Sequence, residues 1–217
     1  MTTIVGIQGD GFAVICADSR ISNDNGEGTI STLGQGMSKV AQNGLYLLGA
    51  AGDVRAINIL HHAFTPPSPA ANLKGKKLDA FITVKFIPAL RECLEKQGYA
   101  YVDKESMSTA SFDSTVIAVV NATIYVIDGD YSWASDSNNT YAIGSGSDYA
   151  LGAMNVLIPK TKLTVNTAKA ICIKALSTAV KYDAGTGAPY HTFLQEGTPA
   201  KRSAITSTPN VPVRKKR

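Results

Sequence analysis

Strand-like and helix-like segments occur in separate blocks along this chain, and their order strongly restricts the fold. Two apolar, β-branched runs at residues 3–8 and 12–17 are joined by Gly9-Asp10-Gly11, which is the pattern of a β-hairpin. A loop rich in Gly, Asn, Ser and Thr is predicted at residues 21–36. After it, two further short strands are predicted near Ser38–Ala41 and Gly44–Gly49. The chain therefore begins with a block of strands.

Four later segments carry apolar residues at helical spacing, in two pairs that flank a second block of strands. The helices are predicted at Asp53–Phe64, Leu78–Lys96, Ser147–Leu157 and Val165–Asp183. Pro66-Pro67 ends the first helix, and Pro88 is expected to kink or break the second because proline lacks an amide hydrogen. Thr164 is placed to cap the last helix through its hydroxyl.

The second block of strands lies between the helix pairs, and one more strand follows the last helix. These strands are predicted at Ser114–Val120, Thr123–Asp128, Tyr131–Ala134, Tyr141–Ser145 and His191–Gln195. If each block of strands forms one sheet, each helix pair can cover the outer face of one sheet. The order therefore predicts an α+β fold, a four-layer α-β-β-α sandwich with two antiparallel sheets.

Length and charge distribution indicate one folded domain and a basic tail. The 217 residues are most simply explained by a single domain at residues 2–196, followed by a polar, proline-containing tail at 197–217 that is expected to be disordered. Six positive charges lie in this tail, and subtracting them from the formal net charge of +4 leaves −2 for residues 1–200. A nucleic-acid role would depend on the tail alone, and we do not expect one.

Cysteine and histidine usage argues against disulfide and metal chemistry. The cysteines are odd in number, widely spaced and set in apolar patterns, at Cys16, Cys93 and Cys172. Reduced thiols of a cytoplasmic protein are therefore expected. No apolar run is long enough to span a bilayer and no signal-like leader precedes the first strand, so neither membrane insertion nor export is expected. His61, His62 and His191 lack metal-ligand spacing and are predicted to be surface or packing residues; no metal or cofactor is predicted.

The start of the chain suggests a specific chemistry. In Met1-Thr2-Thr3-Ile4 the first strand begins directly after a threonine. Removal of Met1 would leave Thr2 with a free α-amine beside its β-hydroxyl, so one residue would supply both a general base and a nucleophile. A β-branched residue that merely opens a strand is the simpler alternative. The rest of the chain decides between the two.

After Thr2-Thr3, five short segments match one protein family in order, and the match extends over about residues 2–195. They are Ala17-Asp18-Ser19-Arg20, Ser38-Lys39-Val40, Leu48-Gly49-Ala50-Ala51-Gly52-Asp53, Gly144-Ser145-Gly146-Ser147-Asp148-Tyr149-Ala150-Leu151-Gly152 and Asp183-Ala184-Gly185-Thr186-Gly187. This set resembles the β-type subunits of the proteasome family and the bacterial HslV-type peptidases, which are N-terminal-nucleophile (Ntn) threonine peptidases. The resemblance implies that the sandwich is an Ntn-hydrolase fold.

For the nucleophile, the resemblance implies Thr2 with its own amine as base, and Asp18 with Lys39 as the ion pair behind it. A free α-amine has a pKa of about 7.7–8.0, so roughly an eighth of it is unprotonated at pH 7. A nearby cation lowers that pKa, and a drop of about one unit would leave more than half unprotonated. Lys39 can supply the cation, and Asp18 would compensate its buried charge.

For the supporting groups, the resemblance implies Gly52 as the oxyanion-hole N–H and Ser145 with Asp183 as partners of the amine. Thr186 stands where the family pattern most often has a serine, so it keeps the hydroxyl and adds a methyl group. Considered alone, each of these positions could have a purely structural role. Gly52, for example, could simply be a glycine at the start of a helix. The residues expected by resemblance to shape the specificity pocket are Ile21, Met37, Ala41, Ala50 and Val54. They predict a preference for uncharged apolar side chains.

The resulting functional prediction is a threonine endopeptidase that hydrolyses unfolded polypeptides inside a closed homo-oligomeric ring of about twelve or fourteen subunits. The sequence contains no G-x-x-x-x-G-K-[ST] motif, so an ATP-dependent unfoldase would be a separate chain. Two alternatives stay open at this point. One is a ring subunit with a structural role and no turnover, and the other is an Ntn amidohydrolase that acts on small amides.

Overall fold

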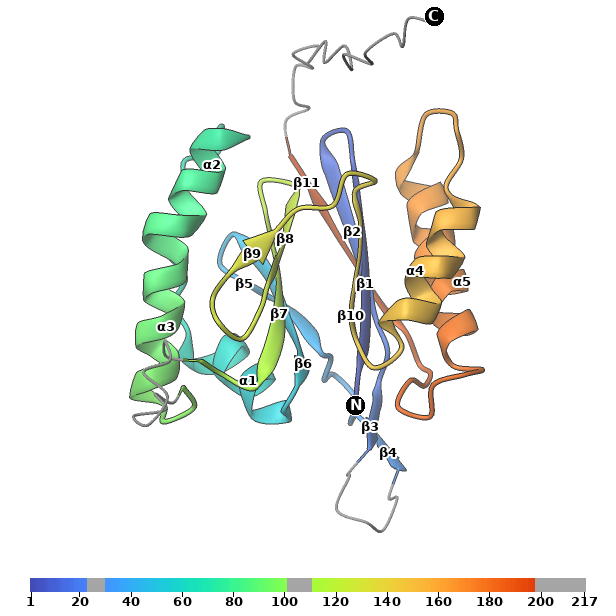
Figure 1. Ribbon diagram of the computed structural model, residues 1–217, viewed down its shortest axis with the longest axis horizontal. Coiled ribbons are helices and arrows are strands. Elements are labelled where there is room, and N and C mark those ends of the chain that lie inside the picture. The colour runs from blue at the N-terminus through green and yellow to red at the C-terminus, as the bar shows by residue number, and fades with distance from the viewer. Residues whose placement is uncertain (23–29, 101–110, 198–217) are drawn as a thin grey trace, which may run out of the picture.

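The computed structural model describes residues 1–22, 30–100 and 111–197, and it has the α+β composition that the sequence predicts (Figure 1). Helices lie on two sides of the molecule, and antiparallel strands occupy the space between them. Residues 198–217 of the predicted tail lie outside the described residues, whereas the Gly197 amide donates to the Gly11 carbonyl at 2.8 Å. Within the described residues, no helix combines the length and the apolar character that crossing a bilayer requires.

Two antiparallel sheets form the centre of the molecule. The first has the strand order β10-β1-β2-β11, at Thr140–Gly144, Thr3–Gly9, Phe12–Ala17 and His191–Glu196. The second has the order β5-β6-β7-β8-β9, at Val40–Asn43, Tyr46–Gly52, Ser114–Val120, Thr123–Ile127 and Trp133–Ala134. A short ribbon pairs β3 (Arg20–Ser22) with β4 (Ile30–Thr32) in a region where the sequence predicts only a loop.

The prediction that each block of strands forms its own sheet is wrong. β10 leaves the second block to pair with β1, which places Thr3 opposite Gly144. In exchange, β6 of the first block pairs with β7 of the second, which places Gly52 opposite Ser114. Local patterns specify the hairpins, but these pairings join segments far apart in the sequence. Only the burial of whole strands selects them.

In the part of the chain that the structure describes, five α-helices and two π-helical segments cover the sheets. They are α1 (Val54–Asn58), η1 (Ile59–Ala63), α2 (Lys76–Phe81), η2 (Ile82–Phe86) and α3 (Ile87–Lys96), followed by α4 (Ser147–Leu157) and α5 (Val165–Ala179). The bounds predicted for α4 are confirmed, and the Thr164 hydroxyl caps α5 by accepting from the Thr167 amide at 3.2 Å. Pro88 lies in the first turn of α3, directly after η2 has changed the hydrogen-bond pattern, so its missing amide interrupts no regular helix.

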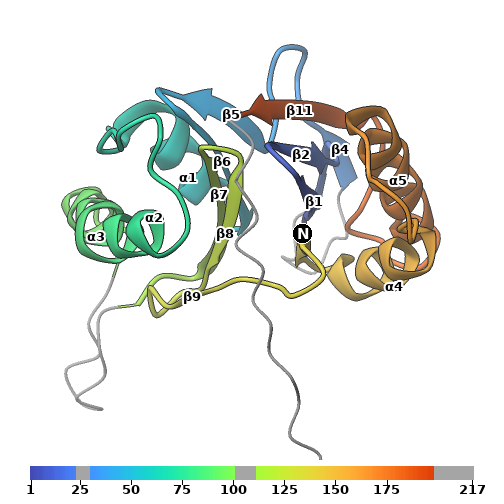
Figure 2. The same cartoon turned by 90° about the horizontal axis from the view of Figure 1, so that it is seen from above.

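Both sheets are buried on both faces. Along β1 and β2 the side chains alternate, so that Ile4 and Ile15 face the other sheet whereas Val5 and Val14 face α4 and α5. The same alternation on β6 and β7 divides their side chains between the sheet–sheet core and a core beneath the α1–α3 helices. Seen from above, the two helix groups lie outside the two sheets (Figure 2).

The ends of several elements meet around the start of β1. Sheet pairing sets Thr3 opposite Gly144 at the end of β10, and Ile4 opposite Ala17 at the end of β2. His191 at the start of β11 also lies opposite Ala17. The end of β6 and the beginning of α1 approach the same region from the second sheet. Residues from distant parts of the sequence are thereby brought to one place.

Candidate active site

Thr2 precedes β1, and its backbone is held against the turn between β10 and α4. Its carbonyl accepts a hydrogen bond from the Ser145 amide at 2.9 Å. Gly144 has a φ of +95°, and a Cβ at this position would lie 1.9 Å from the Thr2 carbonyl oxygen. Only glycine permits so close an approach in this conformation. The turn therefore fixes Thr2, which is itself buried.

Asp18 and Lys39, which the resemblance pairs behind Thr2, form a buried ion pair. The Lys39 Nζ lies 2.6 Å from Asp18 Oδ1, and the two side chains are 2% and 0% exposed. The Asp18 carboxylate also accepts from three backbone amides, those of Thr3 at 2.8 Å, Arg20 at 3.0 Å and Gly187 at 3.0 Å. A buried charge is tolerated when it is paired and fully hydrogen-bonded, as here.

The Lys39 ammonium also reaches the peptide bond that precedes Thr2. It donates to the Met1 carbonyl oxygen at 3.3 Å. Burial lowers the pKa of Lys39, and the charge and hydrogen bond of Asp18 partly oppose this effect. The cation is therefore held next to the position that the Thr2 α-amine would occupy if Met1 were removed.

Ser145, Asp183 and Thr186 form a second cluster on the other side of Thr2. The Ser145 hydroxyl donates to Asp183 Oδ2 at 2.9 Å, and the Thr186 hydroxyl donates to the same oxygen. The Gly185 amide donates to Asp183 Oδ1 at 3.2 Å. The Ser145 hydroxyl also lies 3.4 Å from the Thr2 carbonyl oxygen. The added methyl group of Thr186 thus leaves its hydroxyl bond to Asp183 intact.

Thr3 extends this cluster, and sequence reasoning assigned it no role. The Gly146 amide donates to the Thr3 hydroxyl at 3.1 Å, and the Thr3 and Thr186 hydroxyls are hydrogen-bonded to each other. Because the Thr186 proton is directed to Asp183, Thr3 must donate to Thr186. Thr3 is fully buried. The signal in the sequence was a second hydroxyl-bearing residue directly after the candidate nucleophile, at the start of the apolar first strand.

Gly52 lies at the end of β6, where two cavities meet. Its φ is +127°, and a Cβ there would lie 2.5 Å from the Ser114 Oγ and 2.8 Å from the Asp113 carbonyl oxygen. The position therefore requires glycine. Asp53, the next residue, caps α1 by accepting from the Arg55 amide at 2.8 Å. Gly52 thus leaves its backbone uncovered by a side chain at the junction of strand and helix.

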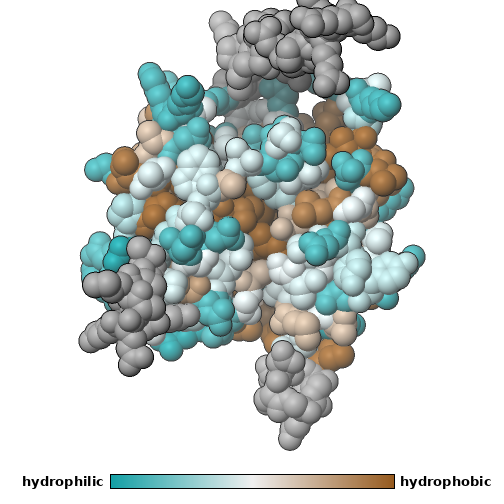
Figure 3. Space-filling view, viewed as in Figure 1, coloured by the Kyte–Doolittle hydropathy of each residue, from teal (hydrophilic) through white to brown (hydrophobic). Residues whose placement is uncertain are grey.

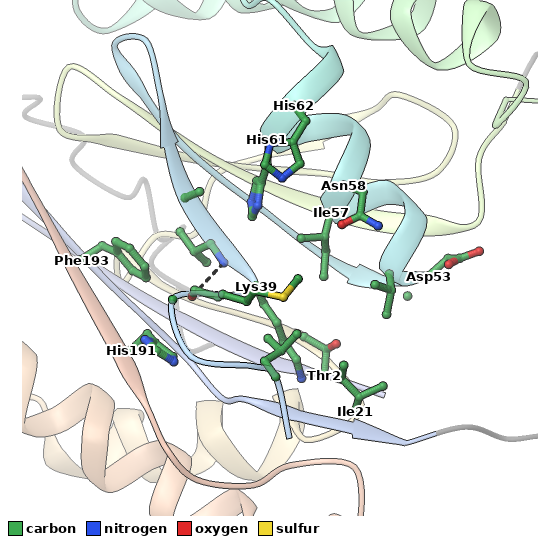
Figure 4. A pocket seen from close by; sticks show the side chains of 18 of the residues that line it. Thr2, Ile21, Lys39, Asp53, Ile57, Asn58, His61, His62, His191 and Phe193 are labelled. Atoms are coloured by element: carbon green, nitrogen blue, oxygen red, sulfur yellow. Dashed lines mark hydrogen bonds between the residues drawn. The ribbon is translucent and has the colours of Figure 1, made fainter. Parts of the chain in front are cut away.

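A cavity of about 640 Å³ opens beside Thr2 and is lined by Lys39 and Gly52 as well (Figure 4). A second cavity of about 500 Å³ shares Thr2 and Gly52 and continues past Ser145. Four of the predicted specificity residues line the larger cavity: Ile21, Met37, Ala41 and Val54. The prediction is wrong for Ala50, because strand alternation turns its side chain into the core beneath the helices.

The prediction that the three histidines are surface or packing residues fits exposed His62 and His61, which is bonded to the Leu48 carbonyl, but it did not place them in a cavity. His61, His62 and His191 all line the larger cavity together with Thr2. The sequence does not indicate this position, because the histidines lack metal-ligand spacing and neither the π-helical turn of η1 nor the position of β11 follows from a local pattern. Among the residues that the structure describes, no cluster of His, Cys, Asp or Glu has the arrangement of a metal site.

Comparisons with known proteins give a match at the level of the fold. The structure of Thiobacillus denitrificans BPH in complex with epoxomicin matches with a TM-score of 0.69 and 21% identity, over 91% of this chain and 100% of that chain. A second structure of Thiobacillus denitrificans BPH gives the same values. Eukaryotic HslV from Trypanosoma brucei matches with a TM-score of 0.56 and 19% identity, over 89% of this chain and 99% of that chain. No family model and no curated protein matches the sequence. This chain therefore has an HslV- and proteasome-like fold.

Proposed function

We propose that this protein is a threonine endopeptidase that hydrolyses unfolded polypeptides in the cytoplasm, with Thr2 as the nucleophile after removal of Met1. The proposal includes the four-layer α-β-β-α form of the Ntn-hydrolase fold, which the three hydrophobic clusters support. The observation that carries it is the position of the Lys39 ammonium, 3.3 Å from the carbonyl oxygen of the Met1–Thr2 peptide bond and 2.6 Å from Asp18.

The Lys39 cation would make the Thr2 amine a base at neutral pH. Once Met1 is removed, the ammonium that now contacts the Met1 carbonyl would face the new α-amine. A neighbouring positive charge disfavours the protonated amine and lowers its pKa. The general base would then be ready near pH 7, where an ordinary α-amine is mostly protonated.

In the proposed reaction, the Thr2 hydroxyl oxygen attacks the substrate carbonyl carbon and its proton passes to the Thr2 amine. The Gly52 N–H would stabilise the oxyanion that forms. Collapse breaks the C–N bond, the leaving amine takes the proton, and an ester remains on Thr2. Water then attacks the ester with the amine again as base, which releases the acid and restores the hydroxyl.

Asp183 with Ser145 and Thr186 would hold the amine in place. The carboxylate accepts both hydroxyl protons, so the Ser145 oxygen is left free to accept from the Thr2 ammonium formed during the reaction. The Thr2 carbonyl is bound to the Ser145 amide at 2.9 Å, which fixes the same residue from its other end. Orientation of this kind is a large part of enzymatic rate acceleration.

A closed homo-oligomeric ring, supplied with substrate by a separate ATP-dependent unfoldase, completes the proposal. An open site of this kind would cleave proteins without selection, and a ring excludes folded ones. The surface supports contacts between copies: Figure 3 shows hydrophobic residues at the upper right, where the end of α4 lies. Val156, in the last turn of α4, is 83% exposed.

The test combines intact mass with hydrolysis of an unfolded polypeptide. We expect the purified protein to lack Met1 and to cleave reduced, carboxymethylated proteins but not their folded forms. Epoxomicin, which is bound in a BPH structure, is expected to occupy the cavity beside Thr2 and to inhibit cleavage. Retention of Met1 with no hydrolysis would support the structural ring subunit. Hydrolysis of small amides alone would support the amidohydrolase.

A further inference from the structure

We propose that His61, His62 and His191, here called the histidine wall, bind a carboxylate-bearing side chain of the peptide that occupies the cavity beside Thr2. The identification of the ligand as a peptide rests on the proposed function. The inference changes the specificity expected from sequence, which predicts uncharged apolar side chains from Ile21 and Val54. The cavity thus combines an apolar part with a part that can become cationic.

The histidine wall is built from two elements that belong to different sheets. His61 and His62 come from η1, which follows α1, and His191 is the first residue of β11. Figure 4 shows the first two rings above the cavity and His191 on its lower side. π-Helical turns are rare and often occur at functional sites, because they redirect neighbouring side chains. Here the turn places two consecutive histidines in the lining of one cavity.

His61 is held in one tautomer by the backbone of β6. Its Nε2 lies 3.1 Å from the Leu48 carbonyl oxygen, which can only accept, so Nε2 carries the hydrogen. The remaining ring nitrogen, Nδ1, gains a hydrogen only when the ring is protonated. The His62 ring packs edge-on at a centroid distance of 6.1 Å. A bound carboxylate would thus meet two adjacent rings, one of them fixed.

The other charged groups of the cavity leave the histidines without an acidic partner. Among the described lining residues, the charged and titratable groups come from five places. Asp53 precedes α1, η1 contributes His61 and His62, the segment before β5 contributes Lys39, the chain start contributes the amine of Met1, and β11 contributes His191. Lys39 is paired with Asp18. Asp53 caps α1, and Figure 4 shows it on the opposite side of the cavity from His191. A substrate carboxylate would therefore supply the missing negative charge.

Binding of a carboxylate should be linked to proton uptake. Burial lowers the pKa of His61, and the nearby His62 adds to this effect, while the hydrogen bond to Leu48 opposes it. An incoming carboxylate favours the protonated ring and so raises the pKa of His61. Histidine changes charge between about pH 5 and 8, so the preference for an acidic side chain should strengthen as the pH falls through this range. An uncharged isostere should show no such linkage.

The test measures peptide binding to the Thr2→Ala protein, which needs no turnover. Three pairs of fluorescein-labelled peptides carry Glu or Gln at one of three successive positions, and anisotropy gives Kd at pH 8.0 and 5.5. For at least one pair, we expect the Kd of the Gln peptide divided by the Kd of the Glu peptide to rise at least ~10-fold as the pH falls from 8.0 to 5.5. His62→Gln and His191→Gln, added to Thr2→Ala, should each reduce the rise. Asn58→Ala, which alters an untitratable lining residue, should preserve it.

Three outcomes would overturn the proposal: a ratio independent of pH in every pair, a rise that both histidine variants retain, or no binding of any peptide. His62 is exposed, so its substitution is not expected to unfold the protein. Hydrolysis by the wild-type protein is measured separately. Turnover without a preference for Glu would reject the histidine wall and leave the proposed function standing. Binding of the Glu peptide that depends on pH, without turnover, would reject the proposed function and leave the histidine wall standing.

Discussion

At the scale of single residues, the buried charge of Lys39 has two separable effects, on the amine of Thr2 and on stability. We expect Lys39→Ala to lower kcat/KM by at least ~10²-fold, the usual range for general-base function. We also expect a loss of about 3–5 kcal/mol in the free energy of unfolding, because Asp18 would be left without its cation. Lys85→Ala, at an exposed position, is the matched control.

Peptide hydrolysis and chemical denaturation of both variants distinguish these effects. The three backbone amides that donate to Asp18 should keep the Lys39→Ala protein folded. If its kcat/KM falls less than about tenfold, Lys39 has a structural role only and the amine is activated in another way.

Thr3 is expected to be a positioning residue, because its hydroxyl links Gly146 to Thr186 and, through it, to Asp183. Thr3→Val keeps the shape of the side chain and removes the bonds, so it should cost about 1–3 kcal/mol of stability. It should also shift the pH profile of kcat, since the support of the amine loosens. Thr3→Ser keeps the hydroxyl, so it should restore both the stability and the pH profile of kcat. An unchanged pH profile in Thr3→Val would limit the chain of hydroxyls to a structural role.

At the scale of elements, the turn between β10 and α4 offers a sharp contrast between two glycines. Gly144→Ala would place a Cβ 1.9 Å from the Thr2 carbonyl oxygen, so we expect lower thermal stability and loss of hydrolysis. Gly152 lies inside α4, and a Cβ at this position would have no atom beyond the neighbouring helix backbone within 4 Å. Gly152→Ala should raise stability by about 0.5–1 kcal/mol and keep activity. Equal behaviour of the two variants in thermal denaturation would contradict the structure of this turn.

Local sequence patterns predicted most elements because local interactions determine them. The β1–β2 hairpin follows from Gly9-Asp10-Gly11, and the bounds of α4 and the Thr164 cap follow from periodicity and cap chemistry. The pairing of β10 with β1 was not predictable, since strand partners depend on burial across the whole chain. The π-helical turn of η1 was not predicted either, so the place of His61 and His62 in the cavity was not predicted.

The candidate site was predictable at motif positions, and less so elsewhere. Asp18 and Lys39 were paired by resemblance, and the structure brings them to 2.6 Å. The hydrogen bonds of Thr3 and the burial of Ala50 beneath the helices were not predicted. Both follow from the alternation of side chains along strands whose partners were unknown. A side chain can be assigned to one face of a strand only when the sheet around it is known.

At the scale of the whole molecule, exposed apolar residues on the α4–α5 side predict self-association. Val156 is 83% exposed, and Tyr149 and Tyr182 stack on each other at 5.5 Å while 45% and 66% exposed. Native mass spectrometry should therefore give a closed assembly of about twelve or fourteen subunits. Val156→Lys should weaken it, whereas Val84→Lys, exposed on the opposite helix group, should not. A stable monomer that hydrolyses peptides would reject the compartment and favour an amidohydrolase of small substrates.

The role of Thr2 as nucleophile is tested most directly by comparing peptide hydrolysis by the wild-type protein and by Thr2→Ala. The Asp18–Lys39 pair and the Ser145–Asp183–Thr186 cluster converge on this one residue, so its hydroxyl should be indispensable. We expect Thr2→Ala to lose hydrolysis while its fold and assembly stay intact, and Thr2→Ser to keep part of the rate because it retains the hydroxyl and the amine. Cleavage by folded, assembled Thr2→Ala at the wild-type rate would show that Thr2 is not the nucleophile.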